Sequence, residues 1–547
     1  MGPVSLEEAL SQAIRQDVNL VVRHVVGAPT PCPPIFSPPV GEPVEATICK
    51  QHFLAVSINT GHEKEIDPDQ HTEGDNSSDA NELLVFAIEV LVYTTDKLST
   101  LFVSKADSTG YLSLLNRDPD SPAAYSLTRN VLSVFLYYLV RIYQRPDVNL
   151  VLSLFARAQD QYLFPGSSEN KGKHILDDRG LIKWWCRVID PVMQCIELEG
   201  SDTGPRPPTA TSSPACGQSV TSHLIVPGCD TFETRNFLPK NERANNGAGG
   251  RWRLNYPLHQ ICSYPDAPPR CLVPRFPDDP KARFLIDLDD EITEEDPPHG
   301  LKNSGQWHSV KSLDQFWEMM SYRQECSAGR LVGFLWMIVK PLPATIETAV
   351  EKPPTTTDSA AKDQPPNGEE EETKGKSAAE RSLEAPENDR DGSIIPISNS
   401  DYKGLSDYLL DLDFSNQHDA TINTKLWVEE LSSLTGCPKE GLRITGKGPL
   451  TGPPPTTSTS STGESAVATN LLSGGIIRKR KRQPSIILPT PGESTTASSH
   501  DSSTSQQEQQ GSEAVGLDPK ILSQEQSAPI APVVNVLSGT LIRKKRK

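Results

Sequence analysis

The sequence predicts a mixed α/β (α+β) fold in which helices flank a central sheet, and three observations support this prediction. Residues 82–95 form a nearly continuous apolar run, rich in β-branched side chains, which is typical of a strand covered on both faces. Residues 126–141 and 178–197 carry apolar side chains at helical spacing. Only 36% of the 547 residues are hydrophobic, and 36 are Gly and 48 are Pro, so long disordered segments are expected.

The N-terminus is expected to begin with a helix. Ser5 stands three residues before Glu8, the capping-box spacing, and an amphipathic stretch follows. The basic and apolar regions of a signal peptide are missing, so we expect an intracellular protein. No apolar run approaches the roughly 18 residues that cross a bilayer, so no membrane association is expected.

The first predicted strand, at residues 82–95, leads into a local strand–turn–strand unit. Asp96 marks the turn, and residues 101–105 predict the second strand. Residues 107–110 predict a further turn, because Asp and Gly accept turn geometry. Another helix is expected at residues 314–326, where apolar side chains again recur at helical spacing.

Composition divides the chain into four parts, with the main part of a folded domain at residues 1–345. Residues 346–398 are predicted to be a disordered acidic insertion, because the stretch 351–392 has no aromatic residue and 12 acidic against 6 basic residues. Residues 399–446 are expected to complete the domain as a helical part, with a helix capped by Asn423 and ended by Gly436. Residues 447–547 read as a flexible Ser/Thr/Pro/Gln-rich tail.

The tail contains one motif twice. Residues 470–482 recur at residues 535–547, each time with aliphatic side chains before a basic cluster. Basic clusters of this kind direct nuclear import, and the shared aliphatic part also fits a short motif that docks a protein partner. Both interpretations remain open, and the first predicts a nuclear protein.

Charge and cysteine content narrow the partners. The net charge is −18, and residues 449–547 carry 11 basic against 7 acidic residues, which leaves −22 on residues 1–448. An acidic body favours a basic partner and argues against direct, sequence-specific nucleic-acid binding. The ten cysteines include no CxxC pair, so we expect reduced thiols, with neither disulfides nor a metal site.

Two glycine-rich segments approach known signatures without matching them. Residues 441–448 resemble a phosphate-binding loop, but Gly448 stands where a hydroxyl must hold magnesium. Residues 243–249 miss a glycine of the pyrophosphate signature of common acetyltransferases and lie in a stretch, 241–250, that we interpret as a loop. No HExxH or GxSxG pattern is present, so any catalysis must use other residues.

Three dense stretches are more specific when taken together. They are FVSKADSTG at 102–110, LFARAQDQYLFPGSSENKGKHIL at 154–176 with the pair Trp184-Trp185, and FPDDPKARF at 276–284. This combination closely resembles the fungal regulator of Ty transposition family of histone H3 lysine acetyltransferases. Segments at 316–325 and 431–436 fit the same family.

Acetyl transfer to lysine needs donors for the pyrophosphate of acetyl-CoA, an apolar tunnel, a base and an oxyanion donor. Cationic candidates lie beside a Gly/Ser-rich turn: Arg157, Lys171, Lys173 and His174. Aromatic side chains can form the tunnel wall: Phe155, Tyr162, Phe164, Trp184 and Trp185. Asp278 and Asp279 form a carboxylate pair between prolines, in which one could attract the lysine ammonium and the other accept its proton.

The resemblance implies roles for individual residues. With Lys173 as a cationic donor, the acetyl-CoA site is expected to be lined by Ala106, Asp107, Ser108, Phe155, Gln159, His174, Ile175, Leu176 and Trp184. Asp279 is expected to be the catalytic acid or base, with Asp278 next to it, and Tyr162 and Trp185 to lie beside the channel for the substrate lysine. Lys281 is expected to be acetylated by the enzyme itself and to be buried near Asp107.

The resemblance also implies a fold and a setting. The fold is expected to be similar to that of the histone acetyltransferases of the CREB-binding-protein type, and the substrate to be newly synthesised histone H3 in the H3–H4 dimer. Histone chaperones are the implied activating partners, with replication-coupled nucleosome assembly and the DNA damage response in the nucleus as the setting. The alternative is a non-catalytic histone-binding chaperone scaffold that keeps the fold.

Overall fold

The structure is a computed structural model that describes residues 5–60, 81–115, 123–199, 219–244, 250–293, 305–323, 330–341, 394–436 and 441–448. Most of the predicted acidic insertion and both copies of the repeated basic motif lie outside the described residues. Within the described parts of the chain, no helix is long and apolar enough to cross a membrane.

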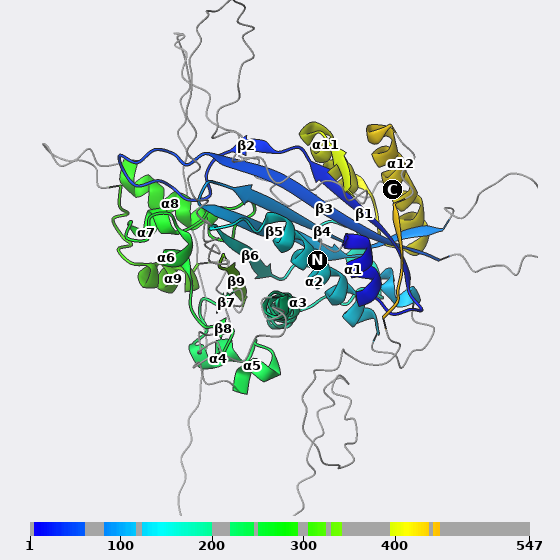
Figure 1. Ribbon diagram of the computed structural model, residues 1–547, viewed down its shortest axis with the longest axis horizontal. Helices are drawn as coiled ribbons and strands as arrows, with labels where there is room; N and C mark the ends of the chain where they lie inside the picture. Colours follow the sequence, from blue (N-terminus) through cyan, green and yellow to red (C-terminus); the bar gives the residue numbers. More distant parts are fainter. Residues whose placement is uncertain are drawn as a thin grey trace, which may run out of the picture. The chain divides into compact units, whose positions relative to one another are not determined.

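An eleven-stranded sheet forms the centre of the described part (Figure 1). Its strands are β1 (Asn19–Gly27), β2 (Thr30–Cys32), β3 (Thr47–Asn59), β4 (Glu82–Thr94), β5 (Leu98–Ser108), β6 (Asn149–Arg157), β7 (Val220–Ile225), β8 (Trp252–Arg253), β9 (Val332–Val339), β10 (Ile394–Ile397) and β11 (Leu442–Thr445). The order is β10-β1-β3-β4-β5-β6-β9-β7-β8, with β11 paired to β1 and β2 paired to β3.

The helices surround this sheet. They are α1 (Leu6–Ala13), α2 (Ala123–Tyr143), α3 (Asp178–Glu199), α4 (Thr231–Arg235), α5 (Lys240–Ala244), α6 (Leu258–Ile261), α7 (Pro269–Leu272), α8 (Ala282–Thr293), α9 (Leu313–Ser321), α11 (Asn399–Asp411) and α12 (Gln417–Thr435). Two short 3-10 helices, η2 (Tyr111–Leu115) and η3 (Ser167–Glu169), are also present among the described residues. The predicted mixed fold of a central sheet flanked by helices is confirmed.

Strand β4 lies near the middle of the sheet and is buried along its whole length. It pairs with β3 on one side and β5 on the other, which explains why its sequence is almost continuously apolar rather than alternating. The predicted strand at 82–95 is therefore confirmed, and the one at 101–105 is the middle of β5.

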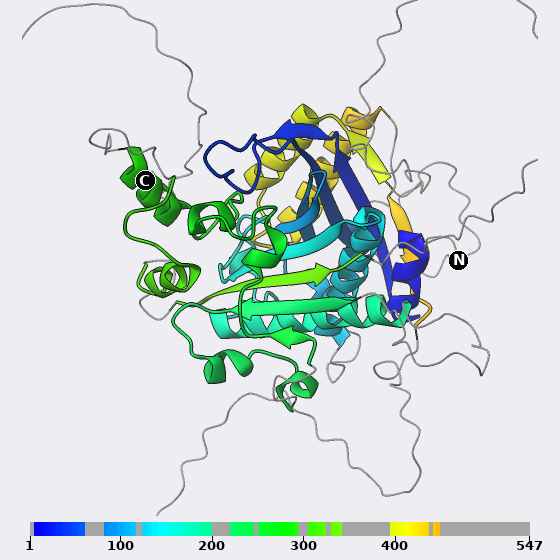
Figure 2. The same cartoon turned by 60° about the vertical axis from the view of Figure 1, so that its left-hand side comes forward.

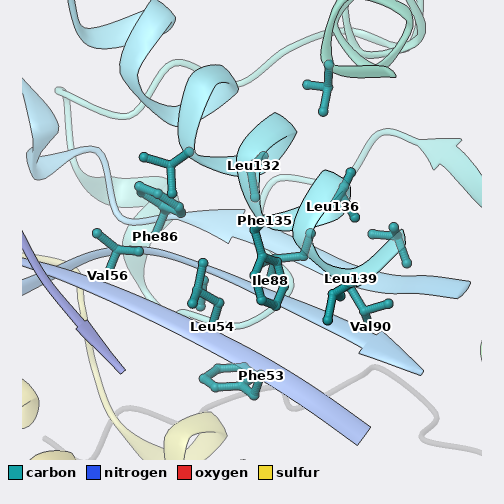
Figure 3. Packing of buried hydrophobic residues seen from close by; sticks show 14 of the residues in the cluster. Phe53, Leu54, Val56, Phe86, Ile88, Val90, Leu132, Phe135, Leu136 and Leu139 are labelled. Carbon is teal, nitrogen blue, oxygen red and sulfur yellow. The ribbon is translucent and has the colours of Figure 1, made fainter. Parts of the chain in front are cut away.

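Each face of β3 and β4 packs against different helices. On one face, Figure 3 shows α2 lying over the strands, with Leu132, Phe135, Leu136 and Leu139 against Leu54, Val56, Ile88 and Val90. Phe53 points to the other face, where its ring lies 6.1 Å from that of Trp427 of α12. The sheet is thus the middle layer, because both of its faces are apolar.

Helices α6 to α9 build a second core against β9. Buried side chains of α8 and α9, such as Phe284 and Phe316, cluster with Phe334 and Trp336 of β9. These green helices lie beside the sheet in Figure 2. The predicted helix at 314–326 ends earlier, at Ser321. This second core carries the loop at 276–281.

The helix caps were predicted with one error. Ser5 accepts a hydrogen bond from the backbone N–H of Glu8, and Gly436 ends α12 with φ 66°, both as expected. Asn423, however, lies inside α12, which begins at Gln417 with Asn416 as its cap. The large buried apolar side chains of α12, such as Trp427 and Leu431, lie in its later turns, so the apolar pattern alone placed the helix start too late.

The glycine-rich segment at 441–448 is part of the sheet, and only the start of the one at 241–250 lies in a described helix. Within residues 441–448, Leu442–Thr445 form β11 against β1, and the N–H of Gly448 donates to the Ile14 carbonyl at 2.7 Å. A Cβ at Gly446 would come within 1.8 Å of the Arg15 carbonyl oxygen, so close backbone approach explains that glycine. In the other segment, 241–244 belong to helix α5 rather than to the expected loop.

Candidate active site

A cavity opens where two parallel strands separate. Strands β5 and β6 pair only as far as Val103 and Leu154. Beyond that point β5 continues along β4 to Ser108, and β6 continues along β9 to Arg157. The carboxyl ends of two neighbouring strands therefore diverge, which is where open α/β sheets commonly form ligand sites.

The cavity has a volume of about 310 Å³ and is bounded by the ends of β5 and β6, by α2 and α3, and by residues 158–176. All ten residues predicted to bind the cofactor line it: Ala106, Asp107, Ser108, Phe155, Gln159, Lys173, His174, Ile175, Leu176 and Trp184. Tyr162 and Trp185 line it as well. The fold thus brings together residues that are up to 79 positions apart in the sequence.

Asp107 organises one wall of the cavity. Its Oδ2 accepts hydrogen bonds from the backbone N–H groups of Tyr162, Leu163 and Phe164, at 2.7, 2.9 and 3.3 Å. Its Oδ1 accepts from the Nζ of Lys173 at 2.8 Å, and both side chains of this ion pair are almost fully buried. Asp107 and Lys173 therefore fix the turn that carries Tyr162, and their charges are directed toward each other.

Aromatic side chains from α3 and from the loop that precedes it also line the cavity. The rings of Trp184 and Trp185 lie 5.0 Å apart in an edge-on arrangement, and Trp185 is the more buried of the two. The hydroxyl of Tyr162 donates to the Arg157 carbonyl. Burial raises the pKa of Tyr162, the Arg157 guanidinium opposes this, and the carboxylate of Asp278 adds to the rise. Tyr162 is therefore held as a neutral hydrogen-bond donor at neutral pH.

Asp279 and Lys281 lie outside the cavity lining, behind Phe155. The Lys281 Nζ lies 2.7 Å from each Asp279 carboxylate oxygen, and both side chains are only 1% exposed. The same Nζ lies 4.5 Å from the centre of the Phe155 ring, which faces the cavity. One aromatic ring thus stands between the cavity and this buried ion pair.

The charges of this loop pair locally. Lys281 is buried as predicted, and its ion-pair partner is Asp279, whereas Asp107 is engaged by Lys173. Asp278 and Asp279 do not act as a like-charge pair, because Asp278 is exposed with φ 51° while Asp279 faces Lys281. The positive φ turns consecutive side chains apart, and a sequence pattern cannot predict that turn.

Sequence reasoning missed some lining residues. Lys105 lines the cavity, and its Nζ lies 4.0 Å from the Oε2 of Glu89. Thr128 and Leu132 line the cavity from α2. Arg157 lines the cavity as a predicted cation, whereas Lys171 is exposed and is not part of the lining. Lys105 stands two residues before Asp107 in a strand, and two-residue strand periodicity was the signal that could have identified it.

The arrangement suits an elongated ligand with one charged and one apolar end. Leu132, Leu181 and Trp184 provide apolar surface, while Lys105 and Arg157 provide positive charge on the strand side. A buried carboxylate lies behind one aromatic ring of the wall. Such a hollow can orient an acyl carrier and place its reactive end near a potential base.

Comparison with known proteins gives consistent matches. The profile of the family "Histone acetyltransferase KAT11-type domain" matches residues 6–147 and 125–430. "Histone acetyltransferase rtt109" of Aspergillus flavus is 42% identical over 496 residues, which cover 81% of this chain and 84% of the relative. "Histone acetyltransferase rtt109" of Schizosaccharomyces pombe is 31% identical over 253 residues, covering 46% of this chain and 56% of the relative.

A solved structure is similar as well. The crystal structure of Rtt109 from Aspergillus fumigatus has a TM-score of 0.63 and 45% sequence identity, and the match covers 82% of this chain and 100% of that chain. Sequence and fold therefore agree on the same group of proteins.

Proposed function

This chain belongs to the Rtt109 family of KAT11-type histone lysine acetyltransferases, and on that premise we propose that it transfers acetyl from acetyl-CoA to a lysine of newly synthesised histone H3. The observation that carries the proposal is that all ten predicted cofactor residues line the same cavity, with the Asp279–Lys281 pair directly behind Phe155.

The lining fits the acetyl donor that the family implies. Acetyl-CoA supplies an activated thioester on a long pantetheine arm, and the arm requires an apolar hollow of the kind that Leu132, Leu181 and Trp184 provide. Lys105, Arg157 and His174 can meet the phosphates with cationic or polar donors. Asp107 and Lys173 act indirectly in this proposal, by holding the turn that carries Tyr162.

Asp279 is the proposed acid or base, and Lys281 controls it. While Lys281 is an ammonium ion, it neutralises the Asp279 carboxylate across two 2.7 Å contacts. Acetylation of Lys281 by the enzyme itself removes that positive charge and leaves a neutral amide. The carboxylate then keeps the backbone N–H of Lys281 as a donor and becomes more able to accept the proton of the substrate lysine.

Tyr162 and Trp185 are the proposed neighbours of the substrate lysine. Both line the cavity, and Asp278 lies close enough to Tyr162 to affect its pKa. Asp278 is exposed, so it can attract the approaching ammonium group before Asp279 removes a proton. Trp185 is 5% exposed and offers a mostly apolar surface for the aliphatic part of the lysine.

The wider setting is part of the same proposal. The net charge of −18 suits a strongly basic substrate such as the histone H3–H4 dimer, delivered by histone chaperones that activate the enzyme. We place this reaction in the nucleus, in replication-coupled nucleosome assembly and the DNA damage response. The two basic motifs of the tail, outside the described residues, would serve import or docking.

The test is a transfer assay with the purified full chain, acetyl-CoA and histone H3–H4, with and without a histone chaperone. Mass spectrometry of H3 should find acetyl-lysine, and Asp279→Asn and Trp185→Ala should each lower its rate by about a hundredfold or more. Asp287→Asn, on the exposed side of α8, is the control and should retain full activity.

Lys281→Arg tests the self-acetylation step. Arginine keeps the charge and cannot be acetylated, so this variant should transfer acetyl slowly and carry no acetyl group on the 275–283 peptide. Normal turnover by Lys281→Arg would refute the role of Lys281, and absence of acetylated H3 under all conditions would refute the proposed reaction.

A further inference from the structure

Two cysteines on the paired strands β2 and β3 are diagonal neighbours. In the antiparallel register Cys32 lies opposite Thr47, and Thr30 lies opposite Cys49. Residues opposite each other in such a pair share a face, and so do residues two apart on one strand. Cys32 and Cys49 are therefore diagonal neighbours on one face, and both are free, partly buried thiols.

The two thiols differ in reactivity. The neighbouring Cys49 thiol lowers the pKa of Cys32, although burial opposes this. The Cys32 thiol and burial together raise the pKa of Cys49. Cys32 is consequently the thiol that ionises first, and Cys49 is placed to react with it afterwards.

The pair touches the packing that supports the Asp279 loop. Cys32 and Cys49 pack against a small core cluster that contains Tyr93 and Phe276. Tyr93 lies opposite Cys49 in the β3–β4 register, and its ring centre is 6.0 Å from that of Phe276. The backbone N–H of Phe276 in turn donates to Asp279.

A second connection runs through the backbone. Strand β2 continues into Ile35, whose carbonyl oxygen accepts a hydrogen bond of 2.8 Å from the N–H of Arg275. Arg275 directly precedes the 276–281 loop. A displacement of β2 therefore reaches this loop both through Ile35 and through the Phe276 cluster.

We propose that Cys32 and Cys49 form a reversible disulfide when the protein meets hydrogen peroxide, and that this bond lowers acetyl transfer by shifting the loop that holds Asp279. The disulfide goes beyond the proposed function, and only its effect on acetyl transfer rests on that function.

The chemistry balances with peroxide as the two-electron oxidant. The Cys32 thiolate attacks one peroxide oxygen, the O–O bond breaks, and the departing hydroxide takes up a proton to become water, leaving a sulfenic acid. The Cys49 sulfur then attacks the Cys32 sulfur, the S–O bond breaks, and a second water leaves as the S–S bond forms. Two thiols and one peroxide thus give one disulfide and two waters, and a thiol reductant reverses the reaction.

Closing the bond must move β2 rather than β3. A disulfide requires its sulfurs to lie about 2.05 Å apart, closer than two free thiols can approach. Strand β3 is paired with β4 from Ile48 to Asn59, whereas β2 has three residues and pairs only with β3. We therefore expect the shorter strand, β2, to shift toward β3 and to displace Ile35 with it.

The experiment treats the purified full chain with hydrogen peroxide and maps disulfides by peptide mass spectrometry without reduction. We expect the Cys32 and Cys49 peptides to be joined, and acetyl transfer to H3–H4 to fall by about threefold or more, with recovery after a thiol reductant. Cys32→Ser and Cys49→Ala should each resist this loss, while Cys195→Ser, at an exposed position of α3, should respond like the unmodified protein.

Amide hydrogen exchange across residues 275–281 provides a readout that does not depend on catalysis. Oxidation should change exchange in this segment in the unmodified chain but not in Cys32→Ser. Failure to find the Cys32–Cys49 linkage would overturn the proposal. It would also be overturned if peroxide inhibited Cys32→Ser and Cys49→Ala as strongly as it inhibits the unmodified chain. If the untreated chain transfers no acetyl group, the linkage and the exchange change still decide the disulfide, and only the proposed function fails.

Discussion

Two buried lysine–aspartate pairs lie near Phe155, and they differ in what else the aspartate holds. Asp107, on the cavity wall, accepts Lys173 and three consecutive backbone N–H groups of the Tyr162 turn. Asp279, behind the ring, is bound mainly by the side chain and N–H of Lys281, two residues away. The first pair ties distant segments together, and the second is a local pair within one loop.

This difference separates a structural charge pair from one that a modification can switch. Neutralising Lys173 would still leave Asp107 with its backbone donors, so the wall could persist. Neutralising Lys281 would leave the Asp279 carboxylate largely uncompensated, which suits a group that must take up a proton. The geometry of the partners, more than the depth of burial, sets these roles.

The largest expected effect comes from breaking the local pair. Asp279→Asn removes the carboxylate that faces the buried Lys281 ammonium, so the free energy of unfolding should fall by about 3 kcal/mol. Asp278→Asn is the matched control, since its side chain is exposed and Asn tolerates positive φ, and it should change stability by less than about 0.5 kcal/mol. Urea denaturation measures both values.

A second substitution separates charge burial from packing in this pair. Adding Lys281→Met to Asp279→Asn removes the buried ammonium as well and should recover most of the lost stability. No recovery in the double variant would mean that the loop depends on the hydrogen bonds of Asp279 rather than on its charge.

A smaller effect is expected at the cavity wall. Asp107→Asn keeps an oxygen for some of the N–H donors but loses the carboxylate that holds Lys173, so unfolding free energy should fall by about 2 kcal/mol. Calorimetric titration should also show weaker acetyl-CoA binding, because the Tyr162 turn is no longer fixed. Asp160→Asn, exposed on the same cavity, is the control, and an equal loss in that variant would contradict a specific role for Asp107.

A buried histidine cluster should make the stability of the fold depend on pH. His24 Nε2 lies 2.9 Å from His52 Nδ1, and His52 bonds to the Tyr143 hydroxyl at 2.7 Å. Burial lowers the pKa of His24 to about 3 and that of His52 well below its usual value. Below pH 6.5 the unfolded chain binds protons that the folded chain does not, so stability should fall by about 1.4 kcal/mol per pH unit for each histidine.

Unfolding measured between pH 6.5 and 5 checks this, because most carboxylates remain ionised in that range. His52→Gln should reduce the slope of stability against pH by about 1.4 kcal/mol per pH unit, which corresponds to one proton fewer taken up on unfolding. A slope that His52→Gln leaves unchanged would show that the buried histidines do not cause it.

Much of the fold followed from local patterns. The continuous apolar run of β4, the helical spacing of α2 and α3, and the caps at Ser5 and Gly436 were all readable, because they depend on neighbouring residues. Other strands, such as β1, β3 and β6, were not predicted individually. Strands β10 and β11 were missed because each has four residues and gains its identity only by pairing with β1 across the chain, and β10 lies in the segment 346–398 that was predicted to be disordered. The start of α12 was missed because its large buried apolar side chains lie in its later turns.

The sequence by itself determined the residue types of the site and, through resemblance, the ten residues that surround one cavity. Only the tertiary structure decided how the charges pair. Lys281 could not be assigned to Asp279 rather than Asp107 without the turn at Asp278, and Cys32 could not be placed beside Cys49 without the β2–β3 register. Patterns report which side chains favour burial, whereas ion pairs and thiol contacts depend on distances set by the backbone of segments far apart in the chain.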